Sequence, residues 1–317
     1  MSGYLTGSTA AEIASSAWES GCTSPPSASS LRLALLQQMC TDTTPKLQHE
    51  DWNPERDPLL SVRSLQAVAI EDEVPILKGI DLDIRCGEVH ALMGRNGSGK
   101  STLSKVLAGS PAYRVTAGSV LFKGLDLLSL PVDHRAICGL FLAFQYPLEI
   151  PMVTGFEVLR TAVNERRKWR NEEEVSKEDF EESVKPLMKL VDLPYSFLHR
   201  PLNYGFSGGE KKRHELLQLL VLRPSLALLD EADSGLDVDA FATAVAAIKT
   251  YAETSDASFL ITTHYRKLLE AVRPHKVHVM HGGQIVESGG MELAAHIENE
   301  GFGGFLRDQE EGEAKFT

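Results

Sequence analysis

Basic residues are scarce in this chain of 317 residues. Lysine and arginine together number 32, against 44 aspartates and glutamates, so the formal net charge is −12. A field of this sign repels a polyanionic duplex, and any phosphate-binding site must therefore be a local feature. Nucleic acid is not expected as a partner.

Long apolar runs and closely spaced cysteines are also missing. No stretch approaches the roughly 18 uninterrupted apolar residues that would predict a membrane-spanning helix, so no direct membrane insertion is expected. The four cysteines are Cys22, Cys40, Cys86 and Cys138, and no Cys-x-x-Cys pair occurs among them. Such spacing is typical of reduced thiols in a reducing compartment rather than of a disulfide framework or a metal cluster.

The first part of the chain shows no strand alternation. Residues 1–30 hold nine serines and three threonines, with Glu12 and Glu19 as the charged side chains. This composition predicts a disordered extension over residues 1–58, because it offers too little apolar surface for a core. Its hydroxyl content favours an organelle-targeting segment, whereas the lack of a basic residue before Arg32 favours a plain extension. Residues 308–317 are predicted to form an acidic tail.

A phosphate-binding motif follows the third of three predicted strands, which cover residues 61–70, 76–84 and 89–93. The motif reads Gly94-Arg95-Asn96-Gly97-Ser98-Gly99-Lys100-Ser101-Thr102 and matches G-x-x-x-x-G-K-[ST]. Its glycines let backbone N–H groups turn around phosphate oxygens, and the helix predicted over residues 101–108 adds its positive end. Lys100 would supply charge to the β- and γ-phosphates, and the Ser101 hydroxyl can ligate Mg²⁺. A flexible glycine loop is the alternative, but the strand and helix on either side argue against it.

A second candidate site lies at the end of an apolar strand, Leu226-Ala227-Leu228-Leu229, which runs into Asp230 and Glu231. Asp230 is predicted to hold Mg²⁺, and Glu231 is predicted to act as the general base for an attacking water. Two acidic residues after a strand are often only a solvated strand end. The phosphate motif upstream favours the catalytic interpretation.

A second glycine-rich helix start, Ser207-Gly208-Gly209-Glu210, precedes an apolar helical run. It is a second candidate anion site, although a plain helix cap would have the same sequence. If both anion sites serve one nucleotide, two copies of the chain have to meet. A further helix is predicted to begin with a capping box formed by Ser176 and Asp179.

Together these motifs resemble those of the ATP-binding cassette (ABC) ATPases over about residues 60–306. The resemblance implies an α/β cassette over residues 59–307, with a P-loop core sheet and its helices, an antiparallel β subdomain and a helical subdomain at about residues 150–206. It implies that Gln145 is the Q-loop glutamine and that residues 234–237 are the D-loop. It also makes His264, in Thr263-His264-Tyr265, the switch histidine that contacts the γ-phosphate. The expected catalytic residues are then Lys100, Gln145, Glu231 and His264, and the expected Mg²⁺ ligands are Ser101, Gln145 and Asp230.

Longer stretches of the sequence resemble one branch of that class, the SufC-type ATPases of iron–sulfur cluster assembly. They include residues 143–151 and the run Gly205-Phe206-Ser207-Gly208-Gly209-Glu210-Lys211-Lys212-Arg213. The resemblance implies that ATP drives a transient head-to-tail homodimer and thereby reshapes SufB- and SufD-type scaffold proteins. It points to the chloroplast stroma, with the cytoplasm as the alternative. Arg95 stands where this branch usually has proline, and Met152 where it usually has glycine; neither departure removes a phosphate ligand.

The nucleotide-binding subunit of an ABC transporter is the alternative function, because it would share the same ATPase core. It predicts co-purification with an integral membrane protein. Chromosome-maintenance ATPases carry a long coiled coil between the first and second glycine motifs, but Lys100 and Ser207 are only 107 positions apart. Translation-factor ATPases have two cassettes where this chain has one, so both of these classes are disfavoured.

Overall fold

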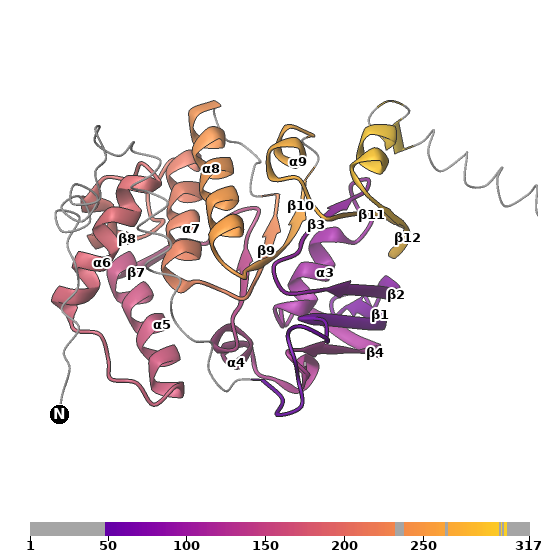
Figure 1. Cartoon of the computed structure of the whole chain (residues 1–317), viewed down its shortest axis with the longest axis horizontal. Coiled ribbons are helices and arrows are strands. Elements are labelled where there is room, and N and C mark those ends of the chain that lie inside the picture. Colours follow the sequence, from indigo (N-terminus) through magenta and orange to yellow (C-terminus); the bar gives the residue numbers. More distant parts are fainter. Residues whose placement is uncertain (1–47, 232–237, 264–265, 298, 300, 303–317) are drawn as a thin grey trace, which may run out of the picture. The chain divides into compact units, whose positions relative to one another are not determined.

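The computed structural model describes residues 48–231, 238–263, 266–297, 299 and 301–302 (Figure 1). The expected D-loop, His264, the first 47 residues and the acidic tail lie outside the described residues. The strands are β1 (Leu60–Ala69), β2 (Pro75–Ile84), β3 (Val89–Met93), β4 (Tyr113–Phe122), β5 (Leu125–Asp126), β6 (Leu140–Ala143), β7 (Ile150–Thr154), β8 (Pro201–Leu202), β9 (Leu226–Asp230), β10 (Ser258–Thr262), β11 (Lys276–His281) and β12 (Gln284–Gly289). The helices are α3 (Lys100–Leu107), α4 (Val132–Ile137), α5 (Gly155–Trp169), α6 (Lys177–Leu190), α7 (Gly208–Leu222), α8 (Val238–Thr254) and α9 (Arg266–Val272), with 3-10 turns η1 (Leu127–Ser129) and η2 (Tyr195–His199).

A six-stranded sheet carries the two motifs that end predicted strands. Its order is β12-β11-β3-β10-β9-β6, and every neighbouring pair is parallel except β11 with β12. All residues of β3, β9 and β10 are buried, which explains why most of them are apolar. Because parallel strands end at the same edge, the loop after β3 and the carboxylates at the end of β9 come to one side of the sheet.

A second, antiparallel sheet has the order β2-β1-β4-β5. Helix α3 joins the two sheets into one core, in which Leu92 of β3, Leu103 of α3 and Val120 of β4 are completely buried. Burying one such side chain stabilises a fold by about 1.5–3 kcal/mol. The elements expected at residues 61–70, 76–84, 89–93 and 101–108 are thus β1, β2, β3 and α3, with ends shifted by no more than one residue.

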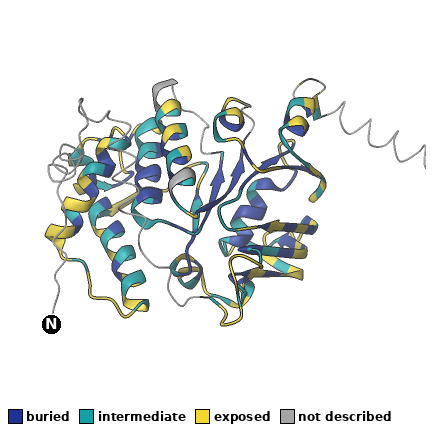
Figure 2. Ribbon diagram, in the orientation of Figure 1, coloured by how far each residue is buried: buried dark blue, intermediate teal, exposed yellow. Residues whose placement is uncertain are grey.

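Helices α5 and α6 fall within the segment expected to form a helical subdomain, and both carry buried and exposed positions (Figure 2). The buried residues of α6 are all apolar, namely Phe180, Val184, Leu187 and Met188. Ser176 does cap α6, accepting from the Asp179 N–H at 3.0 Å. The expected capping box is only half formed, however, because the Asp179 carboxylate accepts from the Ser176 hydroxyl at 2.7 Å. Aspartate is one methylene shorter than the glutamate that reaches back in a full box. Thr154 and Glu157 form such a full box at the start of α5.

Two histidines are buried where β3 and β11 pair. His90 Nδ1 lies 3.0 Å from His278 Nε2, and the outer nitrogens contact Glu88 Oε2 at 3.0 Å and Ser288 Oγ at 2.7 Å. Burial lowers the pKa of both imidazoles, and that of His278 falls to about 4. Both rings are therefore neutral at pH 7 in the folded protein.

This pair is expected to weaken the fold in acid. Between about pH 6.5, where an unfolded histidine titrates, and pH 4 the unfolded chain binds more protons than the folded one. Stability therefore falls as the pH falls, by up to about 1.4 kcal/mol per pH unit for each buried histidine. Urea unfolding at pH 7, 6, 5 and 4.5 should show a steeper loss for the wild type than for His278→Gln. Parallel stability profiles would contradict this assignment.

Candidate active site

The phosphate motif forms the loop between β3 and α3. Gly94 and Gly99 have φ values of 156° and 107°. A Cβ at Gly94 would overlap the main-chain oxygen of Met280, and a Cβ at Gly99 would press on the side chain of the same methionine. Only glycine fits these two positions, and as a result the loop backbone packs closely against the end of β11.

The loop contains polar groups suited to an anion. The Lys100 side chain is buried, and its Nζ donates to the carbonyl oxygens of Gly94 at 2.8 Å and Arg95 at 3.1 Å. Burial lowers the pKa of this amine. Ser98 is 5% exposed, and its hydroxyl has no hydrogen-bond partner within the described part of the chain. A buried polar atom without a partner is uncommon, and a phosphate oxygen would satisfy it.

Ser101, at the start of α3, contacts the carboxylate that ends β9. Its hydroxyl donates to Asp230 Oδ1 at 2.8 Å. Asp230 is 2% exposed, and burial is the largest influence on its pKa, which is raised. A hydroxyl and a carboxylate offer the oxygen ligands that Mg²⁺ prefers. The donor set therefore fits the cation expected from the sequence.

Gln145 and Glu231, two of the expected catalytic residues, are also adjacent. Gln145 Nε2 donates to Glu231 Oε2 at 2.6 Å. Glu231 has a φ of 47°, a left-handed conformation that is strained for a residue with a side chain, and its N–H donates to the carbonyl oxygen of Thr262 at 3.0 Å. The backbone thus turns away from the line of β9 at the residue that carries the second carboxylate.

The second glycine motif starts α7. Ser207 and Glu210 form a reciprocal capping box, in which the Ser207 N–H donates to the Glu210 carboxylate at 2.7 Å and so lowers its pKa. Ser207 and Gly208 are exposed. Within the described residues no hydrogen bond or ion pair joins this helix start to the phosphate loop. The cap interpretation and the anion-site interpretation are compatible, because Gly208 and Gly209 supply the first helical N–H groups.

Two charged residues at the site were not singled out in the sequence. Lys212 and Glu215, on the second and third turns of α7, are buried and contact the backbone just before Gln145. In the sequence they stand in a charged stretch just before the apolar helical run, and nothing in that pattern distinguishes buried charges from exposed ones. The two departures from the family pattern, Arg95 and Met152, are both exposed.

Comparison with known proteins identifies the class. The family model described as "ABC transporter" matches residues 77–234. A solved dimeric bacterial ABC transporter cassette aligns with a TM-score of 0.63 and 20% identity, over 73% of this chain and 98% of that one. The "Iron-sulfur cluster assembly protein SufC" of Plasmodium falciparum is 51% identical over 87% of this chain and 79% of its own. "ABC transporter I family member 6, chloroplastic" of Arabidopsis thaliana is 46% identical over 78% and 73% of the respective chains.

The fold and the phosphate loop define an ATP-hydrolysing enzyme of the ABC class, which confirms the α/β cassette expected from the sequence. The long alignment at 51% identity also identifies the branch of this class to which the chain belongs. The chain belongs to the SufC family.

Neither a cluster of metal-ligating residues nor a membrane-spanning helix is found among the described residues. Across the residues that the structure covers, no group of three or more His, Cys, Asp or Glu is arranged to hold a metal ion. None of the described helices combines the length and apolar character needed to cross a bilayer.

Removing the buried amine of the loop should abolish activity without unfolding the protein. Lys100→Ala is expected to lower ATP hydrolysis by about 100-fold or more, because a preorganised positive charge at the phosphates is lost. Circular dichroism should show an intact fold, since the amine bonds only to two carbonyl oxygens of its own loop. The exposed Lys78→Ala variant is the matched control and should retain wild-type turnover. Near-normal hydrolysis by Lys100→Ala would refute the role of Lys100.

Proposed function

We propose that this protein is the ATP-hydrolysing subunit of the machinery that assembles iron–sulfur clusters. The observation that carries the proposal is the meeting of Ser101 with Asp230 and of Gln145 with Glu231 at one edge of the parallel sheet. The name of the relative from Plasmodium falciparum supports the assembly role.

In the proposed reaction the N–H groups of residues 94–102 and the Lys100 amine hold the phosphates of ATP. Ser101, Asp230 and Gln145 would hold Mg²⁺, which would offset phosphate charge when bound. Glu231 accepts the proton of the attacking water, and the amide of Gln145 orients that carboxylate through the observed hydrogen bond. His264 is proposed to contact the γ-phosphate.

The second half of each nucleotide site is proposed to come from another copy of the chain. Ser207, Gly208, Gly209 and Glu210 stand at the start of α7, and Ser207 and Gly208 are exposed. Within the described residues no hydrogen bond or ion pair joins them to the phosphate loop of their own chain. A head-to-tail homodimer would present them to the γ-phosphate bound on the mate. Hydrolysis removes that shared phosphate, so the dimer is transient.

SufB- and SufD-type scaffolds are the proposed partners, and the cluster would form on them. Apolar side chains gather on the surface over residues 144–152, where Tyr146, Leu148 and Met152 are 79%, 66% and 90% exposed. We name these residues the Q-loop surface. Exposed apolar side chains in one short segment favour a protein partner. Because this segment contains Gln145, a scaffold seated there would respond to the state of the ATP site.

A plastid location, in the chloroplast stroma, is part of the proposal, with the cytoplasm as the alternative. The relative from Arabidopsis thaliana is named as chloroplastic, and the hydroxyl-rich leader of this chain is compatible with targeting. Domain limits of 1–58, 59–307 and 308–317 complete the proposed organisation.

Glu231→Gln should trap the dimer. The amide keeps the shape of the side chain but cannot take a proton, so hydrolysis is expected to fall by about 100-fold or more. Light scattering with ATP and magnesium should then show a lasting dimer, whereas Glu71→Gln, on the surface, should behave as the wild type. Wild-type turnover in Glu231→Gln would refute the general-base assignment.

Met152→Asp tests the Q-loop surface. A charge placed there should reduce recovery of scaffold subunits in an affinity pull-down from the native host by about 10-fold, while the isolated chain still hydrolyses ATP. Val132→Asp changes an equally apolar, exposed side chain on α4 and is the control. Recovery of membrane permeases instead of scaffolds would favour the transporter alternative. If Met152→Asp recovers as much scaffold as the wild type, the scaffold docks on another surface and the proposed role of the Q-loop surface is wrong.

A further inference from the structure

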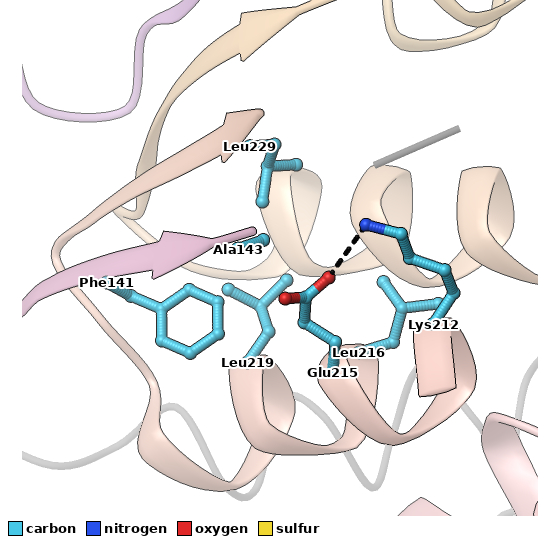
Figure 3. A pocket seen from close by; sticks show the side chains of 7 residues that line it. All are labelled: Phe141, Ala143, Lys212, Glu215, Leu216, Leu219 and Leu229. Carbon is cyan, nitrogen blue, oxygen red and sulfur yellow. Dashed lines mark hydrogen bonds and ion pairs between the residues drawn. The ribbon is translucent and has the colours of Figure 1, made fainter. Parts of the chain in front are cut away.

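An ion pair lies inside the protein on helix α7. Lys212 Nζ and Glu215 Oε2 are 3.1 Å apart, and the two side chains are 6% and 7% exposed. Figure 3 shows the pair beside a small cavity whose other lining residues, Phe141, Ala143, Leu216, Leu219 and Leu229, are all apolar. Burial is the largest influence on the pKa of the Glu215 carboxyl, which is raised. Two charges in such surroundings lose much of their hydration, and that loss commonly outweighs their attraction.

Both members of the pair hold the main chain of the same residue, Phe144. Glu215 Oε1 accepts from the N–H of Phe144 at 2.7 Å, and Lys212 Nζ donates to the carbonyl oxygen of Phe144 at 2.6 Å. The last paired residue of β6 is Ala143, opposite Leu229, so Phe144 is the first residue beyond the strand ladder. The side chains of α7 therefore replace the ladder bonds that Phe144 lacks.

The residue held in this way lies next to the catalytic glutamine. Gln145 follows Phe144 directly and donates to Glu231 at 2.6 Å. Two more contacts hold the same segment farther on: Lys211 pairs with Glu149 at 2.6 Å, and Asn203 donates to the carbonyl oxygen of Leu148 at 2.8 Å. A continuous chain of bonds thus runs from α7 through the main chain of Phe144 and the side chain of Gln145 to the carboxylate of Glu231.

The same helix is capped by Ser207, and its first turn is proposed to face the second copy of the chain. Its next turns hold the segment that leads to Gln145. We propose that Lys212 and Glu215 are positioning residues for ATP hydrolysis, which hold the main chain of Phe144 so that Gln145 orients Glu231. The inference rests on the proposed function. It assigns to the pair a task in catalysis rather than in nucleotide binding, dimerisation or folding.

The decisive comparison is between a single and a double variant. Glu215→Leu leaves the Lys212 charge buried without its partner and should lower both stability and activity. Lys212→Met combined with Glu215→Leu removes both charges from an apolar site, so the melting temperature should return to that of the wild type or above it. Both variants lose the acceptor for the N–H of Phe144, and the double variant also loses the donor to its carbonyl oxygen. If the pair served stability alone, activity would return together with the melting temperature.

In the double variant we expect kcat to fall about 10- to 100-fold, the cost of a misplacement near 1 Å, while the KM for ATP stays within about threefold. In the Glu231→Gln background the double variant should still dimerise with ATP. Gln218→Met removes a bond to His214 on the same helix, away from the Q-loop, and should leave kcat unchanged.

Each outcome has a separate meaning. A double variant that is stable and fully active would overturn the positioning role. A raised KM with unchanged kcat would overturn it as well, because the pair would then act on binding. Absence of ATP hydrolysis in the wild type would instead refute the proposed function.

Discussion

The hydrogen bond between Ser101 and Asp230 joins residues 129 positions apart in the chain, and the rest of the site is arranged around it. It forms because β3 and β9 both pair in parallel with β10, so that the three strands end together. The start of α3 follows β3, and the carboxylate ends β9. The order of strands in the sheet is thus the constraint that turns two separate motifs into one site.

Burial gives that site its electrostatic character. It lowers the pKa of the Lys100 amine and raises that of the Asp230 carboxyl, so each charged form is disfavoured in the protein alone. Phosphate oxygens would favour the charged amine, and a divalent cation would favour the charged carboxylate. Ser98 adds a buried hydroxyl that needs an acceptor or donor. A bound phosphate group would therefore supply hydrogen-bond partners that the protein itself does not offer to this loop.

Helix α7 connects two surfaces that are proposed to serve different partners. Its first turn is capped by Ser207 and Glu210, and its second and third turns hold the segment that leads to Gln145. The Q-loop surface begins in that same segment. A rigid helix transmits a displacement at one end to the other, so the proposed contacts with a second copy and with a scaffold would both act on Glu231.

Local chemistry made much of this protein predictable. Phosphate binding needs consecutive residues, so the loop at 94–102 was evident from its sequence, as were the carboxylates after 226–229 and the short strands around them. Three contacts could not be predicted from the sequence. They are the hydrogen bond of Gln145 with Glu231, the contact of His90 with His278 and the bonds of Lys212 and Glu215 to Phe144. These contacts join segments that are distant along the chain, and they depend on which strands and helices become neighbours. Hydrophobic periodicity specifies which face of an element is buried, but only the packed tertiary structure specifies what that face meets.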